Sequence, residues 1–296
     1  MNLVQILRSV FASEDINFLL TNRVPRNVLT RWLGRFSKIR HPWVARASIA
    51  VWRLFTDLDL SDAAKPQFDS LHDCFTRALR PGARAIDRAP DVMSSPSDGI
   101  VGACGPIHSD AVFQAKGMPY SLAELLGSSA DARVFDGGCY VTLRLTSAMY
   151  HRFHAPHAIA LQRVHYIHGD TWNVNPIALQ RVERLFCRNE RAVLHATLSD
   201  GGHPIALVPV AAILVASIRL HFLDVLLHLR YAGPQRIDCQ ASALKGQELG
   251  WFEHGSTLIV LAPRGFSLCQ DIADGVRVHM GQALMRLPVG AGAGGA

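Results

Sequence analysis

From about residue 86 onward, the sequence consists of short runs of β-forming residues separated by glycine, proline, aspartate and asparagine. Three of these runs are Cys139 to Leu145, Ala192 to Thr197 and Thr257 to Leu261. Many short strands joined by turns are typical of a β-sandwich or a barrel-like sheet, because a β-rich chain buries its apolar residues by packing or closing its sheets. The pattern therefore predicts a mainly antiparallel β body.

The first 85 residues follow a different pattern, in which apolar residues recur at helix spacing. This spacing is seen from Leu3 to Val10 and again from Val44 to Leu58. We therefore predict an α+β fold in three parts. A basic helical region covers residues 1–85, a β-rich domain covers residues 86–285, and a Gly/Ala-rich tail covers residues 286–296 and is expected to be flexible.

Positive charge is concentrated at the N-terminal end. Residues 1–56 contain nine lysines or arginines and two acids, whereas the whole chain has a formal net charge of +6. A basic amphipathic segment with Trp43 and Trp52 suits an anionic membrane surface or a nucleic acid. A helix that packs on its own domain has the same periodicity, so that alternative stays open. No recognised nucleic-acid motif accompanies the charge, and we expect no nucleic-acid partner.

Composition disfavours a disulfide scaffold and a membrane-spanning helix. The six cysteines are scattered without a CxxC pair, which favours a reducing compartment. The longest apolar stretch, Ile205 to Ile218, is about fourteen residues long and contains Pro209, whereas a spanning helix needs about 20 residues. We predict a pair of buried strands there. The first twenty residues lack the apolar block of a secretory signal peptide.

Three polar clusters lie at turns or strand edges, where functional sites often assemble. They are Ser95-Pro96-Ser97-Asp98-Gly99, Tyr150-His151-Arg152-Phe153-His154-Ala155-Pro156-His157 and Gly255-Ser256-Thr257. One residue from each gives a candidate triad of Asp98, His154 and Ser256, because a serine hydroxyl needs an imidazole to take its proton and a carboxylate to orient that imidazole. The sequence does not show that the three residues meet, and an aspartate before a glycine is also ordinary turn chemistry.

The histidines of the second cluster also raise the question of a metal site. His151, His154 and His157 are spaced three apart, and imidazole is the commonest zinc ligand. This spacing does not by itself bring three rings to one point, and no carboxylate or cysteine lies in the segment to complete a site. We therefore expect no metal, and a structural role for all three histidines is the remaining alternative.

Several motifs occur in a recognisable order over roughly residues 86 to 262. In addition to the three clusters, they are Gln114-Ala115-Lys116-Gly117 with Tyr120-Ser121-Leu122, Asn173-Val174-Asn175, Leu185-Phe186-Cys187-Arg188-Asn189-Glu190-Arg191 and Lys245-Gly246-Gln247-Glu248-Leu249-Gly250. Any one of them is weak, but together they are specific. In these motifs the chain resembles a bacterial phosphatidylserine decarboxylase proenzyme, of the pyruvoyl-dependent prokaryotic type.

The resemblance implies that the chain cleaves itself. Asp98, His154 and Ser256 would form the charge relay, in which His154 deprotonates Ser256 and the serine oxygen attacks the carbonyl of Gly255. Elimination from the resulting ester and loss of ammonia would convert Ser256 into an N-terminal pyruvoyl group. The products would be a β chain of residues 1–255 and an α chain of residues 256–296, held together because Thr257 to Leu261 is expected to be a core strand.

The resemblance also implies the reaction of the finished enzyme. The covalent pyruvoyl group would form a Schiff base with the amine of phosphatidylserine and stabilise the carbanion left by loss of CO₂, giving phosphatidylethanolamine. His151 is a candidate proton donor or substrate contact, because it lies next to the relay histidine and a histidine side chain can change its charge near neutral pH. The implied location is peripheral, on the cytoplasmic side of the inner membrane, with phosphatidylserine in an anionic bilayer as the partner and a homodimer as a further assembly.

The chain departs from the family's pattern at a few positions. His254 precedes the Gly-Ser-Thr motif where leucine is usual, Pro209 and Ala216 stand where glycines are expected, and Trp172 replaces a smaller residue. These changes leave the cleavage residues in place but bear on the substrate pocket. Two alternatives therefore stay open: a self-cleaving relative that acts on another amine-bearing acid, and an uncleaved, non-catalytic membrane-binding paralogue.

Overall fold

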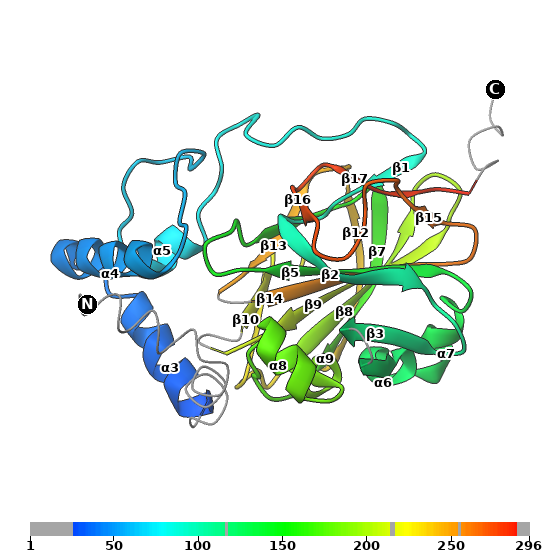
Figure 1. The fold of residues 1–296 in the computed structure, drawn as a ribbon, viewed down its shortest axis with the longest axis horizontal. Coiled ribbons are helices and arrows are strands. Elements are labelled where there is room, and N and C mark those ends of the chain that lie inside the picture. The colour runs from blue at the N-terminus through cyan, green and yellow to red at the C-terminus, as the bar shows by residue number, and fades with distance from the viewer. Residues whose placement is uncertain (1–25, 116–117, 214–216, 254–255, 289–296) are drawn as a thin grey trace.

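The computed structural model describes residues 26–115, 118–213, 217–253 and 256–288. In these ranges, helices at the N-terminal end lie beside a β body made of antiparallel sheets (Figure 1). The helices are α3 (Arg26–Ser37), α4 (Pro42–Phe55), α5 (Leu71–Phe75), α6 (Leu122–Leu126), α7 (Ser129–Arg133), α8 (Pro176–Arg181) and α9 (Leu185–Arg188). The strands are β1 (Val92–Ser94), β2 (Gly99–Pro106), β3 (Ala111–Ala115), β4 (Met118–Ser121), β5 (Cys139–Leu145), β6 (Arg152–His154), β7 (Ile159–Ile167), β8 (Arg191–Leu198), β9 (Pro204–Ala211), β10 (Ser217–Leu220), β11 (Val225–His228), β12 (Arg236–Ala243), β13 (Glu248–Phe252), β14 (Ser256–Ala262), β15 (Ser267–Leu268), β16 (Arg277–Val278) and β17 (Ala283–Arg286).

The main sheet has eight strands in the order β12-β7-β8-β9-β14-β5-β2-β16. Smaller sheets have the orders β11-β10-β13-β6, β1-β17-β15 and β3-β4. Every strand pairing in the described residues is antiparallel, which confirms the predicted α+β fold with a mainly antiparallel body. The barrel-like alternative does not hold, because the edge strands β12 and β16 of the main sheet do not pair within the described ranges.

Strand β14 lies at the centre of the main sheet, between β5 and β9, and all seven of its residues are buried. Its side chains alternate between two cores, because successive residues of a strand point to opposite faces. Leu258 and Val260 belong to a first core, whereas Ile259 and Leu261 belong to a second. Burial on both faces explains the uninterrupted apolar run in the sequence, and it confirms the predicted core strand.

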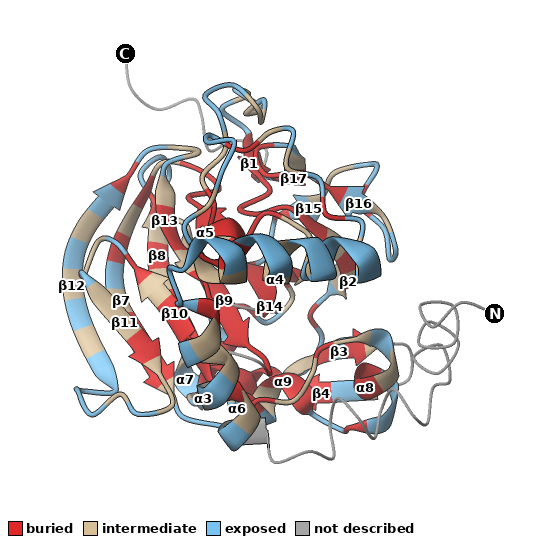
Figure 2. Cartoon of the chain, turned by 90° about the vertical axis from the view of Figure 1, so that its left-hand side faces the viewer, coloured by how far each residue is buried: buried red, intermediate tan, exposed pale blue. Residues whose placement is uncertain are grey.

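The two cores lie on opposite faces of the main sheet. The first fills the space toward the smaller sheets and includes Phe153, Phe252 and Met285. The second lies under the short helices and the β3-β4 hairpin and includes Leu125 and Phe186. Figure 2 shows this buried interior in red, with the mostly exposed helix α4 lying across the outside.

Helix α5 forms one of the contacts between the N-terminal helices and the body. Pro42 begins α4, and a proline is suited to the first helical position because the N–H that it lacks would have no partner there. At the other end of α4, Trp52 stacks on Phe75 of α5, with ring centroids 5.7 Å apart. Phe75 in turn lies 3.9 Å from the ring of His151. No helix in the described part of the chain combines the length and hydropathy needed to cross a bilayer.

The apolar stretch from Ile205 to Ile218 forms β9 and the start of β10, as predicted. Pro209 lies inside β9 opposite Leu258, and the residue pairs between β8 and β9 skip Pro209, which has no N–H to give. Trp172 packs against the second core, where its backbone N–H donates to Asn189. Ala216 lies outside the described residues. Strand β17 extends to Arg286, the first residue of the predicted tail, and residues 289–296 also lie outside the described ranges.

Candidate active site

Ser256 is the first residue of β14 and is fully buried. It pairs with Leu145 of β5 on one side and with Ala211 of β9 on the other. By strand alternation its side chain faces the first core, on the same side as Leu258. The hydroxyl has no hydrogen-bond partner among the described residues. A buried hydroxyl usually has a partner, so an unpartnered one requires a functional or structural explanation. Gly255 and His254 lie outside the described ranges.

His154 ends strand β6 and is 6% exposed. Its Nδ1 lies 3.0 Å from the carbonyl oxygen of Gly246, and its Nε2 lies 2.9 Å from the hydroxyl of Tyr150. A carbonyl only accepts, so Nδ1 carries the proton, and in the neutral ring Nε2 accepts from Tyr150. Burial lowers the pKa of His154, which keeps the ring neutral and able to take a proton at neutral pH.

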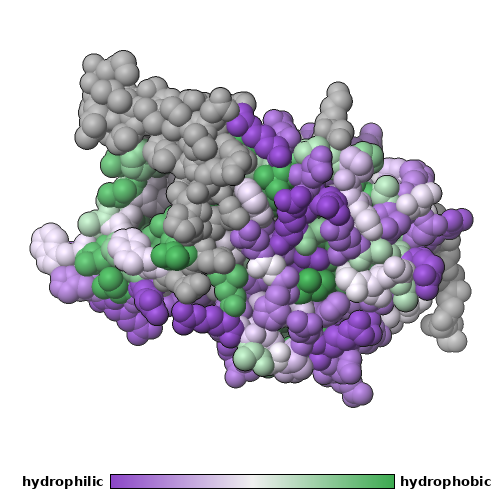
Figure 3. All heavy atoms as spheres, turned by 90° about the horizontal axis from the view of Figure 1, so that it is seen from below, coloured by the Kyte–Doolittle hydropathy of each residue, from purple (hydrophilic) through white to green (hydrophobic). Residues whose placement is uncertain are grey.

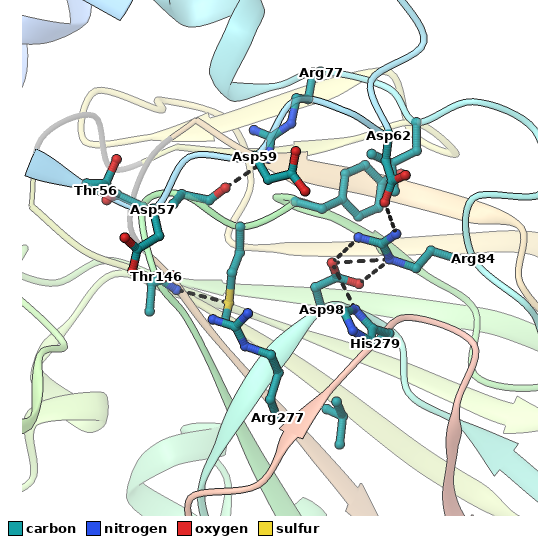
Figure 4. Close-up of a pocket in the computed structure, with 16 residues that line it drawn as sticks. Thr56, Asp57, Asp59, Asp62, Arg77, Arg84, Asp98, Thr146, Arg277 and His279 are labelled. Carbon is teal, nitrogen blue, oxygen red and sulfur yellow. Dashed lines mark hydrogen bonds and ion pairs between the residues drawn. The ribbon is translucent and has the colours of Figure 1, made fainter. Parts of the chain in front are cut away.

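Asp98 lies just before β2 and is 5% exposed. Arg84 donates two hydrogen bonds to its carboxylate, from Nε to Oδ1 at 2.9 Å and from Nη2 to Oδ2 at 2.6 Å. The N–H of Met280 also donates to Oδ1, at 2.9 Å. His279 lies 3.6 Å from Oδ2 (Figure 4). Burial alone would raise the pKa of Asp98, but these donors outweigh it and hold the pKa below the ordinary value. Asp98 is therefore a buried carboxylate anion.

The strand register brings Asp98 and Ser256 to the same end of the main sheet. Arg144 of β5 pairs with Ile100 of β2 on one side and with Thr257 of β14 on the other. Asp98 and Ser256 precede those two partners, so they lie on either side of β5, about 10 Å apart at a strand spacing of about 4.8 Å.

His154 is joined to the segment that holds Asp98 through its backbone, because its N–H donates to the carbonyl of Pro96 at 2.8 Å. No hydrogen bond joins Asp98 to His154, or His154 to Ser256, among the described residues. Arg84 and Met280 occupy the carboxylate of Asp98, while Gly246 and Tyr150 occupy the ring of His154. The structure thus places Asp98 and Ser256 at one end of the main sheet and joins the backbone of His154 to the Asp98 segment, whereas the meeting of all three side chains stays a prediction.

His151 is fully buried beside these residues. Its Nδ1 lies 2.9 Å from the carbonyl of Met149, and its ring packs against Phe75. The carbonyl of His151 accepts the N–H of Phe252, four residues before Ser256. His157, the third histidine of the cluster, has its Nε2 2.9 Å from the carbonyl of Pro90. The three rings thus have separate partners, and the described residues contain no group of three or more potential ligands placed to hold a metal ion.

A cavity of about 380 Å³ lies next to Asp98 and Tyr150. Arg277 and His279 line it from the C-terminal part of the chain, and Arg77 lines it from the N-terminal part (Figure 4). Its wall contains both acidic and basic side chains. Such a cavity suits a small group that carries charges of both signs.

Sequence reasoning missed several residues of this site. Tyr150 is the first residue of the histidine-rich cluster, but nothing in its spacing identifies it as the hydrogen-bond partner of His154. Arg84 lies in the segment between α5 and β1 and has no local signal. Its importance depends on Asp98, fourteen residues away, and appears only in the folded chain.

Glu190 is another buried acid, and its backbone is connected to Ser256 through Ala211 of β9. Its carbonyl accepts the N–H of Ala211 at 2.8 Å, and Ala211 pairs directly with Ser256. The hydroxyl of Tyr166 donates to its carboxyl group. Burial raises the pKa of Glu190 to about 7, because it disfavours the charged carboxylate by more than the hydrogen bond from Tyr166 favours it.

Comparison with known proteins identifies the family. The family model for phosphatidylserine decarboxylase matches residues 71–286. The chain belongs to the phosphatidylserine decarboxylase family. It is 34% identical over 290 residues to a phosphatidylserine decarboxylase proenzyme of Marinobacter nauticus, with 93% of this chain and 99% of that protein covered. It is also 34% identical over 292 residues to the proenzyme of Shewanella frigidimarina, with 93% and 99% covered.

A third relative gives a similar result. The phosphatidylserine decarboxylase proenzyme of Brevibacillus brevis is 35% identical over 271 residues, with 90% of this chain and 95% of that protein covered. The match spans the N-terminal helices as well as the β body in these relatives. The resemblance drawn from the sequence motifs is confirmed at the level of the family.

Proposed function

We propose that this member of the family cleaves itself between Gly255 and Ser256 and then decarboxylates phosphatidylserine to phosphatidylethanolamine. The observation that carries the proposal is the buried hydroxyl of Ser256 at the start of a central strand, which has no hydrogen-bond partner within the described ranges. An ordinary structural serine there would leave a polar group unsatisfied, whereas a nucleophile must keep its oxygen free for attack. The neutral imidazole of His154 and the anionic Asp98 supply the base and the charge nearby.

In the proposed cleavage, the hydroxyl of Ser256 loses its proton toward His154 and its oxygen attacks the carbonyl carbon of Gly255. The C–N bond between the two residues breaks, and residue 255 is left as an ester on the side chain of residue 256. Elimination releases the new carboxylate of the β chain, residues 1–255. Hydrolysis of the remaining enamine releases ammonia and leaves a ketone on the α chain, residues 256–296.

His154 needs a clear route to Ser256 for this step. Its Nε2 is occupied by the hydroxyl of Tyr150, so the proton from Ser256 passes through that hydroxyl or the hydroxyl moves aside. Asp98 acts on His154 through its negative charge, which favours the protonated ring. Arg84 keeps that charge in place by holding Asp98 ionised. The three roles are consistent with general base catalysis assisted by a buried anion.

The group formed at residue 256 fits its surroundings. Position 256 is buried and carries no charge, so a compact carbonyl group replaces the serine side chain without a new charge. A pyruvoyl group at this position supplies a carbonyl that reacts with the substrate amine and withdraws the electrons left by loss of CO₂. The cavity beside Asp98 presents arginines for a phosphate or carboxylate and aspartates for an ammonium, which suits the zwitterionic serine headgroup. His151 is the candidate proton donor for the product carbanion.

Peripheral attachment to the cytoplasmic face of the inner membrane is part of the same proposal. Large apolar side chains are exposed on α3, on α4 and on the turn between them: Val28, Trp32, Ile39, Trp43, Val51, Leu54 and Phe55. Figure 3 shows apolar side chains gathered over this end of the molecule, at the left. Exposed basic residues such as Arg46 lie on the same helices. Apolar and cationic side chains together suit the surface of an anionic bilayer.

Intact mass and a denaturing gel test the cleavage. Purified wild-type protein is expected to give two chains, the smaller beginning at residue 256 with a blocked N-terminus, while Ser256→Ala stays as one chain of 32.4 kDa. A wild-type chain that remains whole at all times would refute the proposal. Trapping with borohydride in the presence of phosphatidylserine, and then with other amine-bearing acids, separates the proposed substrate from the alternative substrates.

Vesicle flotation tests the membrane attachment. Trp32→Ser combined with Trp43→Ser removes two aromatic side chains that are 62% and 76% exposed. We expect this variant to bind phosphatidylserine-containing vesicles at least tenfold more weakly than wild type. Leu244→Ser, at an apolar residue of the β body that is 73% exposed, is the matched control and should bind normally. Equal binding by all three proteins would rule out this surface.

A further inference from the structure

Glu253 is a buried carboxylate three residues before Ser256, and it is 5% exposed. Lys38 donates to its Oε2 at 3.0 Å, and the hydroxyl of Ser217 donates to the same oxygen at 3.0 Å. On the other side, Nε2 of His72 lies 3.6 Å from Oε1. A carboxylate at this depth is stable only with such partners, because an isolated buried charge loses its hydration without compensation.

The backbone around Glu253 is fixed as well. Its N–H donates to the carbonyl of Ser217 on β10 at 3.1 Å, and the preceding Phe252 donates to the carbonyl of His151 at 2.9 Å. The segment that leads to the scissile peptide is therefore held on the β body from two sides. The carboxylate of Glu253 provides a third attachment, and its partners Lys38 and His72 lie outside the β body.

That third attachment goes to the N-terminal helical region. Lys38 directly follows α3, and His72 belongs to α5, so both partners come from the part of the chain that carries the proposed membrane surface. Lys38 and Glu253 lie 215 residues apart in sequence. Both also line a cavity of about 320 Å³ between α3 and the strands β10 and β11.

Lys38 is the partner that carries a full charge at neutral pH. Burial lowers the pKa of His72, so its ring is mostly neutral there. Losing Lys38 would thus leave the carboxylate of Glu253 buried with neutral partners. The carboxylate would then turn toward water, and the backbone of Glu253, three residues before Ser256, would turn with it.

We propose that Lys38 and Glu253 form a positioning pair for self-cleavage, which holds the segment before Ser256 in its reactive place only when the N-terminal helices are seated on the β body. This inference rests on the proposed self-cleavage. It assigns to the helical region a role in making the enzyme, in addition to its proposed role at the membrane. Neither residue touches the reacting atoms, so both act through the placement of the peptide.

The test compares rates of self-cleavage in freshly translated full-length precursor, followed by gel. Lys38→Met and Glu253→Gln are each expected to slow cleavage about tenfold, a change that corresponds to about 1.4 kcal/mol in the barrier. The exchanged double variant, Lys38→Glu with Glu253→Lys, restores the pair and should return to within about threefold of wild type. Asp131→Asn breaks an ion pair of similar length, 3.2 Å to Arg163, far from the cleavage segment, and should cleave normally.

A second readout separates positioning from general loss of structure. Once cleaved, the slow variants should decarboxylate with a kcat within about twofold of wild type, because the pair acts on the uncut peptide. Thermal unfolding of each variant in a Ser256→Ala background checks that the rates were measured on folded protein. Wild-type protein that never cleaves overturns the proposed function itself. Wild-type protein that cleaves while both single variants match it, or an exchanged variant as slow as the single variants, overturns the positioning pair alone.

Discussion

Replacing Arg84 with glutamine should convert Asp98 from a stabilising anion into a destabilising one. In the native protein, Arg84 holds both oxygens of Asp98 and also contacts Asp62 at 2.9 Å. The side chains of Arg84 and Asp98 are 14% and 7% exposed, so solvent screens this pair only weakly. Glutamine keeps part of the side-chain length and removes the charge.

The size of the effect follows from what remains around Asp98. Breaking a buried ion pair by removing one partner typically costs about 3–5 kcal/mol. The N–H of Met280 still donates to Asp98 at 2.9 Å, and His279 still lies 3.6 Å away. We therefore expect Arg84→Gln to lower the free energy of unfolding by about 3 kcal/mol at pH 7, at the lower end of that range.

The pH dependence gives the sharper test. In the wild type the pKa of Asp98 is below its ordinary value of 3.8, so its contribution to stability is present above about pH 4 and is lost as the pH falls through the lower, folded pKa. In Arg84→Gln the effect of burial is no longer offset, and the pKa of Asp98 should rise above 3.8. The buried anion then opposes folding at neutral pH and is relieved by protonation in acid. The stability difference between wild type and variant should therefore shrink on acidification, by roughly 1.4 kcal/mol for each pH unit below the raised pKa.

Urea unfolding at pH 7 and pH 4.5 measures both quantities. A Ser256→Ala background keeps every protein as a single chain, so that one unfolding transition can be analysed. Arg286→Gln is the control, because its ion pair with Asp91 is 3.1 Å long but more than half exposed on both sides and should contribute at most a few tenths of a kcal/mol. A difference that is equal at the two pH values, or a loss in Arg84→Gln no larger than in the control, would show that Arg84 does not hold the charge of Asp98.

Three further substitutions test other parts of the site. Tyr150→Phe should lengthen the half-life of the uncleaved precursor about fivefold, because it removes a hydrogen bond of about 1 kcal/mol that orients the neutral ring of His154. A gel that shows an unchanged half-life would contradict this role. His151→Ala should abolish decarboxylation in protein that has already cleaved, and full activity there would show that His151 is not the proton donor. Glu190→Gln should gain stability relative to wild type as the pH rises from about 5 to about 8. The pKa of Glu190 is raised from 4.5 to about 7, so the free energy of unfolding of the wild type falls by up to about 3 kcal/mol as the pH rises through this window. Urea titrations of Glu190→Gln and wild type in the Ser256→Ala background would refute this if their stability difference did not change between the two pH values.

The central strand could be predicted from the sequence because its signal is local. Thr257 to Leu261 is an uninterrupted run of β-formers, and a strand that is buried on both faces requires such a run. The observed strand starts one residue earlier, at Ser256. The sequence contains no comparable local signal for the order of the strands in the sheet. Whether the main sheet closes into a barrel depends on which strands become edges, and local alternation of residues does not encode that choice.

The sequence offered candidate site residues but not the contacts that those residues make. Asp98, His154 and Ser256 were identified from turn and strand-edge clusters, and the structure places Asp98 and Ser256 at one end of the main sheet. Their partners come from distant positions: the N–H of Met280 reaches Asp98 across 182 residues, and the carbonyl of Gly246 reaches His154 across 92. Neither partner uses its side chain in the contact. Every residue type except proline offers the same backbone groups, so a sequence motif does not identify these two contacts.

The burial of residue 256 bears on the kind of chain end that the proposed cleavage can leave there. Simple hydrolysis of the peptide before Ser256 would leave an α-amino group, with an ordinary pKa near 8, at a position that is 0% exposed. No carboxylate is hydrogen-bonded to Ser256 in the described structure, so that ammonium would be buried without a partner, at a cost of several kcal/mol. Loss of the nitrogen as ammonia removes the charge and leaves a neutral carbonyl group. The strand that follows does not need to move, because its pairs with β5 and β9 from Thr257 onward do not involve the broken bond. The fold therefore favours self-cleavage that ends in a pyruvoyl group over self-cleavage that ends in a free serine.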